Sequence, residues 1–115
     1  MAFNSAGNLY VANSGSNTVS VFSPGSTAPS ATLTGLSDPD ALAFDSSGNL
    51  YVANEGNGTV SKFAPGDTMP SATYTGSSDT EALAIDSSGN LYVANLFANA
   101  VTEFAPGSTT ASATY

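Results

Sequence analysis

The chain has 115 residues, with nine acidic residues against a single basic one and a formal net charge of −8. A surface this acidic repels phosphate groups and anionic lipid headgroups, so we expect no binding to nucleic acid or to a membrane. Cysteine and histidine are absent, which excludes disulfides, thiolate ligands and imidazole catalysis, and no apolar run approaches the roughly 18 residues of a membrane span. We therefore expect a soluble protein. The composition does not identify the cellular compartment, and it is compatible with a secreted bacterial source.

The chain contains an internal repeat. The sequence Gly-Asn-Leu-Tyr-Val-Ala-Asn occurs at residues 7–13, 48–54 and 89–95, at a constant spacing of 41 residues. A fixed period of this length is typical of repeat proteins, in which each unit buries its apolar surface against its neighbours. The sequence predicts three units, at residues 1–40, 41–81 and 82–115, and no separate catalytic domain.

Four short strands are predicted in the complete second unit, in the order in which the chain meets them. Residues 41–44 form a short apolar run that ends at an Asp-Ser-Ser-Gly turn, and residues 49–54 are rich in aromatic and branched side chains. A Gly-rich turn leads to residues 59–63, which alternate clearly, and residues 71–75 form a short, polar edge. Each unit should therefore be a four-stranded antiparallel meander, without helices.

The second of these strands indicates how the sheets pack. Leu50 and Val52 point to one face, Tyr51 and Ala53 point to the other, and all four side chains are apolar. A sheet that is apolar on both faces must be covered on both. Together with a repeat of about 40 residues, this favours an all-β fold made of β-propeller blades.

Residues 36–54 carry a family resemblance. Their sequence, Leu-Ser-Asp-Pro-Asp-Ala-Leu-Ala-Phe-Asp-Ser-Ser-Gly-Asn-Leu-Tyr-Val-Ala-Asn, resembles blades of the NHL-repeat and gluconolactonase-type six-bladed propellers. The resemblance covers the whole chain through its three copies and implies a propeller fold. It says little about activity, because the recurring stretch is scaffold in that family.

Three blades do not close a ring, and the first and third keep the apolar second strand without a polar covering face. An uncovered sheet face of that size is not tolerated by a soluble monomer. We expect a homodimer in which two copies join head to tail in a six-bladed ring; a homotrimer with nine blades is the alternative.

Candidate metal ligands lie where the chain enters the first strand. Asp40 and Glu81 occupy equivalent positions, and Asp38 and Asp79 should share their face. This position resembles the one at which the gluconolactonase-like enzymes bring together their ligands for a divalent cation. The resemblance implies a site for Ca²⁺ or Mg²⁺, which prefer oxygen ligands. The favoured interpretation is that these carboxylates accept backbone N–H bonds and face water, as carboxylates at strand-entry turns usually do. A lactonase or lyase would also need a general base and an electrophile, and the sequence offers no candidate for either.

Two further features are expected on the same face. Asn13, Asn54 and Asn95 end the second strand in every unit, and their repetition favours a structural role such as bonding the following turn over ligand binding. Leu96 and Phe97 replace the small polar residues of the other two turns. Such apolar side chains predict either packing between subunits or coverage of the channel mouth, or else contact with an apolar ligand or partner.

Two functions remain open. The preferred one is a self-assembling propeller module, a structural or binding scaffold without catalytic machinery or a required cofactor. The alternative is a divalent-metal-dependent lactonase-like or lyase-like propeller enzyme, or a remnant of one, with Asp40 and Glu81 as cation ligands.

Overall fold

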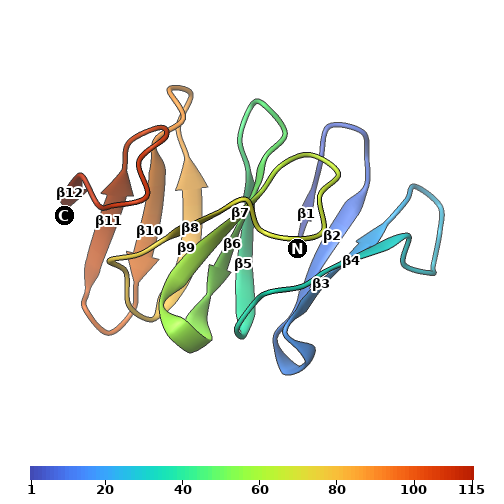
Figure 1. Cartoon of the computed structure of the whole chain (residues 1–115), viewed down its shortest axis with the longest axis horizontal. Helices are drawn as coiled ribbons and strands as arrows, with labels where there is room; N and C mark the ends of the chain where they lie inside the picture. The colour runs from blue at the N-terminus through green and yellow to red at the C-terminus, as the bar shows by residue number, and fades with distance from the viewer.

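The computed structural model describes all residues 1–115 as three four-stranded antiparallel sheets that stand side by side (Figure 1). Within each sheet the strands are neighbours in chain order, so each is a simple meander. We name the sheets blade 1 (β1–β4), blade 2 (β5–β8) and blade 3 (β9–β12). The predicted all-β class and blade topology are confirmed.

The strands have the following bounds: β1 Ala2–Phe3, β2 Leu9–Asn13, β3 Thr18–Phe22, β4 Ala31–Leu33, β5 Pro39–Phe44, β6 Leu50–Asn54, β7 Thr59–Phe63, β8 Ala72–Tyr74, β9 Thr80–Ile85, β10 Leu91–Asn95, β11 Ala100–Phe104 and β12 Ala113–Thr114. Short 3₁₀ turns follow two of the second strands, η1 (Ser14–Ser16) and η2 (Glu55–Asn57). The structure contains no helix with the length and hydropathy of a membrane span.

The strands of blade 2 differ from the prediction mainly at the start of β5. This strand begins at Pro39, two residues earlier than expected, because Pro39 pairs with Asn54 and the ladder resumes at Ala41. The register shift leaves Asp40 opposite no partner, as in a β-bulge. The strand β7 has the predicted bounds, whereas β6 and β8 are shorter than predicted by one and two residues.

The tight turns between first and second strands depend on one acceptor. In blade 2, Asp45 Oδ1 accepts the backbone N–H groups of Ser47 (3.0 Å) and Asn49 (2.9 Å). Burial alone would raise the pKa of Asp45, but bonds from Asn49, Ser47 and the Tyr51 hydroxyl lower it below its ordinary value. Gly48 closes the turn with a φ of 84°, a conformation that favours glycine. Asp45 therefore organises the turn, as the sequence predicted.

Blade 2 is covered on both faces. Every residue from Leu50 to Asn54 is buried, in agreement with the prediction from its two apolar faces. We call the face of a blade that looks toward the next blade in the chain its forward face, and the opposite one its back face. Each of the two interblade cores joins a forward face to a back face.

The two cores are built from equivalent residues. Between blades 1 and 2, Val19, Val21 and Leu33 pack on Leu50, Val52 and Phe63. Between blades 2 and 3, Tyr51, Val60 and Tyr74 pack on Leu91, Val93 and Phe104.

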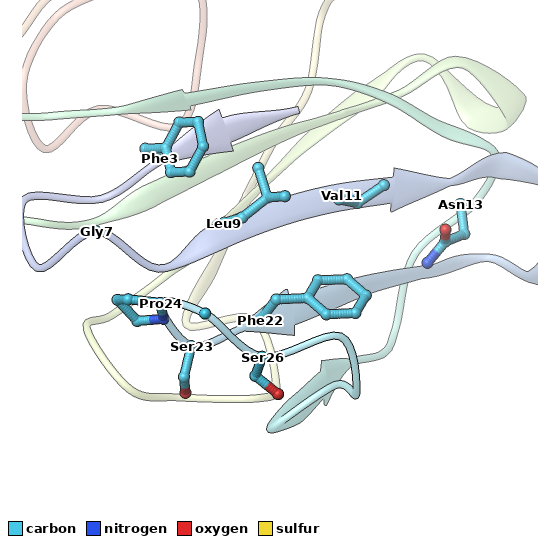
Figure 2. Close-up of a pocket in the computed structure, with 10 residues that line it drawn as sticks. Phe3, Gly7, Leu9, Val11, Asn13, Phe22, Ser23, Pro24 and Ser26 are labelled. Atoms are coloured by element: carbon cyan, nitrogen blue, oxygen red, sulfur yellow. The ribbon is translucent and has the colours of Figure 1, made fainter.

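Two faces have no neighbour. On the back face of blade 1, Leu9, Val11, Phe22 and Phe3 line a groove of about 410 Å³, and Figure 2 shows Asn13 at one end of it. On the forward face of blade 3, two hollows of about 300 Å³ and 180 Å³ both include Val101. These surfaces are the counterparts of the faces that are buried in the two interblade cores.

We expect Asp45→Ala to lower the free energy of unfolding by about 2 kcal/mol, because two backbone and two side-chain hydrogen bonds lose their acceptor. Asp45→Asn should cost less than about 1 kcal/mol, since Asn4 makes the same two backbone bonds in blade 1, to Ala6 (3.1 Å) and Asn8 (2.9 Å). Urea denaturation of the two variants measures the difference. Equal losses would show that the carboxylate charge, rather than the acceptor, holds the turn.

Candidate functional site

The segments that lead into β5 and β9 lie against the turns that follow β6 and β10. We call residues 34–38 and 75–79 the entry segments of blades 2 and 3. The N–H of Glu55 donates to the carbonyl of Asp38 (3.1 Å), and the N–H of Leu96 donates to that of Asp79 (3.0 Å). The two groups of loops that the sequence placed on one face are therefore in direct contact.

The repeated asparagines connect the entry segments to the blades. Asn54 donates through Nδ2 to Ser61 Oγ (2.9 Å) and Thr59 Oγ1 (3.2 Å), and its Oδ1 accepts the N–H of Ser37 (3.2 Å). It is 2 % exposed, so these bonds satisfy an amide that burial would otherwise leave unpaired. Its contacts reach the third strand and the entry segment.

Asn95 has an equivalent environment in blade 3. Its Nδ2 donates to Thr102 Oγ1 (2.8 Å), and its Oδ1 accepts the N–H of Ser78 (3.0 Å). Asn13 makes the same Nδ2 bonds in blade 1, to Ser20 Oγ (2.9 Å) and Thr18 Oγ1 (3.3 Å), but its Oδ1 accepts no hydrogen bond. Two of the three asparagines are thus enclosed by protein, and the third presents its carbonyl at an open face.

Asp40 lies at the bulge of β5, with one carboxylate oxygen in an unfavourable position. Its Oδ1 is buried without a hydrogen-bond partner, so this one oxygen does not face bulk water. Burial, with smaller contributions from the charges of Glu55 and Glu81, raises the pKa of Asp40 from 3.8 to about 6. A backbone hydrogen bond from Ala41 acts in the opposite direction and lowers the pKa of the carboxyl group. Asp40 is thus both the residue that the register shift leaves out of the ladder and a carboxylate with one buried, unpaired oxygen.

Glu81 is the counterpart of Asp40 in β9, and its side chain is exposed. The two carboxylates interact through their charges, and Glu55 adds a third. The structure brings together no group of three or more acidic side chains in an arrangement that could hold a metal ion. We call the edge of the blades that carries the entry segments and the turns after the second strands the rim. The negative charges of the carboxylates at this rim repel one another.

Asp38 and Asp79 have a conformational role in the entry segments. Their φ angles are 44° and 49°, in the left-handed region that side chains other than glycine rarely occupy. The N–H of Asp38 donates to Asn17 Oδ1 (2.7 Å) in the turn of blade 1. Sequence reasoning missed Asn17, although left-handed residues recur at its counterparts Gly58 and Asn99 with the spacing of the repeat.

Leu96 and Phe97 lie in the turn after β10. They are 53 % and 75 % exposed, so both lie largely outside the packed interior of the chain. Leu96 lines the larger hollow on the forward face of blade 3, together with Asn95, Asn99 and Tyr115. The apolar turn therefore lies beside an open blade face.

Comparisons with known proteins support a β-propeller. The family model of the NHL repeat matches residues 36–63, which contain β5, β6 and β7. No curated protein sequence matches the chain.

Two solved structures share the fold. Hydrazine synthase from Kuenenia stuttgartiensis is 19 % identical, with a TM-score of 0.87 over 97 % of this chain and 33 % of that one. A catalytically inactive virginiamycin B lyase from Staphylococcus aureus, crystallised with quinupristin, is 12 % identical, with a TM-score of 0.78 over 93 % of this chain and 37 % of that one. The chain thus spans about a third of the length of each.

The environment of Asp40 predicts a pH-dependent stability. Between pH 3.8 and about 6 the folded state holds a proton that the unfolded chain has lost, so stability falls as pH rises through this window and is then constant. Asp40→Asn should remove this dependence and raise the free energy of unfolding at pH 7 by about 1 kcal/mol, allowing for screening of a partly exposed group.

Urea denaturation between pH 4 and 8 measures this effect, and Asp67→Asn, in an exposed loop, is the control. If Asp40→Asn keeps the full pH dependence of the parent chain, that dependence arises from other titratable groups.

Proposed function

We propose that this chain is a self-assembling β-propeller module, a scaffold whose three blades join those of a second copy in a closed six-bladed ring. One observation carries the proposal: the two open faces are the two halves of an interface that the chain already makes twice. The back face of blade 1 is equivalent to surfaces buried at Leu50 and Leu91, and the forward face of blade 3 is equivalent to surfaces buried at Val19 and Val60.

The aromatic contacts support this assignment in detail. Tyr10 meets Phe44 edge-on at 5.0 Å between ring centroids, and Tyr74 meets Phe104 in the same way at 5.4 Å. Their counterparts at the ends of the chain lie on the open faces: Tyr92 and Tyr115 on blade 3, Phe3 and Phe22 on blade 1. Stacking blade 3 on the partner's blade 1 would pair Tyr92 with Phe3 and Tyr115 with Phe22.

Exposure and the room for a charged side chain are consistent with this stacking. Met1, Phe3 and Tyr115 are 81 %, 67 % and 70 % exposed, although their counterparts Leu42, Phe44 and Tyr74 are at least partly buried. Glu103 is a charged residue on the open forward face, but Lys62 holds the same position between blades 2 and 3, with its ammonium 5.6 Å from the centre of the Tyr51 ring. Lys62 shows that a long charged side chain fits at this position between two blades. The aromatic ring attracts only a cation, and Glu103 instead accepts a hydrogen bond from the Tyr115 hydroxyl.

The number of blades favours two copies over three. A closed head-to-tail ring of two or of three chains uses both open faces of each chain. Six blades lie within the four to eight that are typical of propellers, whereas nine do not. No pairing of a nucleophile with a general base accompanies the rim carboxylates, so we assign the module a structural or binding role rather than catalysis.

We expect light scattering to give a mass of twice 11.4 kDa for the chain at micromolar concentration. Val101→Arg should weaken association by about 100-fold, because it places an unpaired charge where Val19 and Val60 are fully buried. Thr73→Arg is the control, since Thr73 stays exposed on a blade that already has both neighbours. A folded monomer at all concentrations would overturn the ring, and a threefold mass would establish nine blades.

A second candidate function, the divalent-metal-dependent lactonase-like or lyase-like enzyme, is favoured by one observation. The buried, unpartnered oxygen of Asp40 near the charges of Glu55 and Glu81 is a place where a cation would relieve repulsion. A scaffold without a metal should show the same melting temperature in millimolar calcium and in EDTA. A calcium-dependent rise that Glu81→Gln abolishes would instead favour the enzyme, since a bound ion stabilises the folded state.

A further inference from the structure

Three buried side-chain oxygens have no hydrogen-bond partner within the protein, and they belong to Asp40 (Oδ1), Ser77 (Oγ) and Thr80 (Oγ1). Burial of an unpaired polar atom costs folding free energy, because the atom loses its bonds to water without a replacement. Thr80 is fully buried, so its hydroxyl has no contact with bulk solvent. One ligand could satisfy all three oxygens if they lie at the same place in the fold.

Thr80 faces blade 2 at the rim. It pairs with Asn95 in the ladder of blade 3, and opposite residues of antiparallel strands point to the same face. Asn95 continues the series of Leu91 and Val93, whose side chains pack in the core between blades 2 and 3. The Thr80 hydroxyl therefore lies at the rim end of this core.

Ser77 lies at the same end, in the entry segment of blade 3. Its counterpart in the entry segment of blade 2 is Leu36, which packs against the core between blades 1 and 2. The carbonyl oxygen of Ser77 would lie only 3.0 Å from a Cβ added at Gly58, in the turn of blade 2, so this part of the entry segment rests on blade 2. The Ser77 hydroxyl thus takes the place that an apolar side chain has in the other core.

Asp40 supplies the third oxygen from the side of blade 2. Its counterpart Glu81 lines the larger hollow on the forward face of blade 3, so the bulge residue of a blade points forward. On blade 2 that direction leads into the core between blades 2 and 3, where β5 and β9 are in contact. This position explains why Asp40 is less exposed than Glu81 and why burial is the main cause of its raised pKa.

The core between blades 1 and 2 is apolar at the equivalent positions. Leu36 and the buried Pro39 stand there in place of Ser77 and Thr80. Because serine is smaller than leucine and both replacements carry a hydroxyl, the second core has exchanged apolar contact for room and hydrogen-bonding capacity. Such an exchange is unfavourable unless a small polar ligand occupies the space and bonds the hydroxyls.

We infer that the rim end of the core between blades 2 and 3 binds one ordered water molecule, held by Thr80 Oγ1, Ser77 Oγ and Asp40 Oδ1. A buried water typically makes about three hydrogen bonds to groups that are otherwise unpaired. The water donates one proton to the Asp40 carboxylate and the other to one hydroxyl, and it accepts a hydrogen bond from the second hydroxyl. It joins β5 of blade 2 to the entry segment and first strand of blade 3. The site lies within one chain, so it is independent of the proposed ring.

The sign of one substitution tests this inference. Valine has nearly the shape of threonine but no hydroxyl, so Thr80→Val removes one bond to the water. We expect the equilibrium constant for unfolding at pH 7, measured by urea denaturation, to rise about fivefold or more. A hydroxyl without any partner would give the opposite sign, because valine would remove the cost of its burial. An unchanged or smaller constant would therefore overturn the inference.

Thr73→Val is the matched control. Thr73 is exposed on β8 of blade 2, so loss of its hydroxyl leaves no buried group unpaired. The equilibrium constant for unfolding of this variant should stay within about twofold of that of the parent chain. An equal rise in both variants would show that the effect at Thr80 does not come from a buried water, and would overturn the inference.

The water can also be observed directly. In solution, NMR should detect magnetisation transfer from a long-lived water to the amide protons of Ser77 and Thr80. Ser77→Leu copies the residue of the other core and should displace the water, so the signal at Thr80 should disappear while the chain stays folded. In a crystal structure at about 1.5 Å resolution, a water should lie about 2.6–3.0 Å from each of the three oxygens.

Two results of these measurements would contradict a water site. Direct hydrogen bonds among the three oxygens, with no transfer signal from water, would show that the core closes on itself. An ion with six or more oxygen ligands at about 2.4 Å would identify a calcium site instead.

Discussion

The structure depends on one constraint: each blade is a sheet that is apolar on both faces. Such a sheet cannot be stable alone, because either face left in water costs the free energy that burial would have gained. Blade 2 meets the constraint fully, with Val52 and Ala53 both inaccessible to solvent on opposite sides of one strand. Blades 1 and 3 meet it on one side only, and the self-assembly proposed above follows from that difference.

Apolar stacking sets which faces meet, and buried amides fix how the chain passes from one blade to the next. The buried Asn54 and Asn95 each join the third strand of a blade to the segment that leads into its first strand. Because a buried amide is costly when unpaired, these bonds disfavour any other path for the entry segment. The rim of the blades is thus shaped by backbone hydrogen bonding more than by its acidic side chains.

Much of the fold was predictable from the sequence, because its signals are local. The repeat length of 41 residues predicted the blades, and Asp45 predicted the turn between two strands. The apolar pairs Leu50–Val52 and Tyr51–Ala53 predicted that both faces of the second strand are buried. The sequence predicted a structural role for Asn54, but neither the bulge at Asp40 nor the bond from the entry segment to Asn54 was predicted. They depend on a register shift and on a bond between residues 17 positions apart, for which neighbouring residues carry no pattern. Whether the carboxylates of Asp40 and Glu81 face water could likewise be decided only from packing.

The equivalence of the two interblade cores has an evolutionary consequence. The forward faces carry valine together with leucine or tyrosine, and the back faces carry leucine, valine and phenylalanine. Because these two kinds of face fit each other, a blade can follow a copy of itself without a new complementary surface. Tandem duplication of the gene segment for one blade would therefore yield compatible neighbours at once. Fusion of two such genes could encode in one polypeptide what two separate chains would otherwise build, and the seams would then be free to diverge independently.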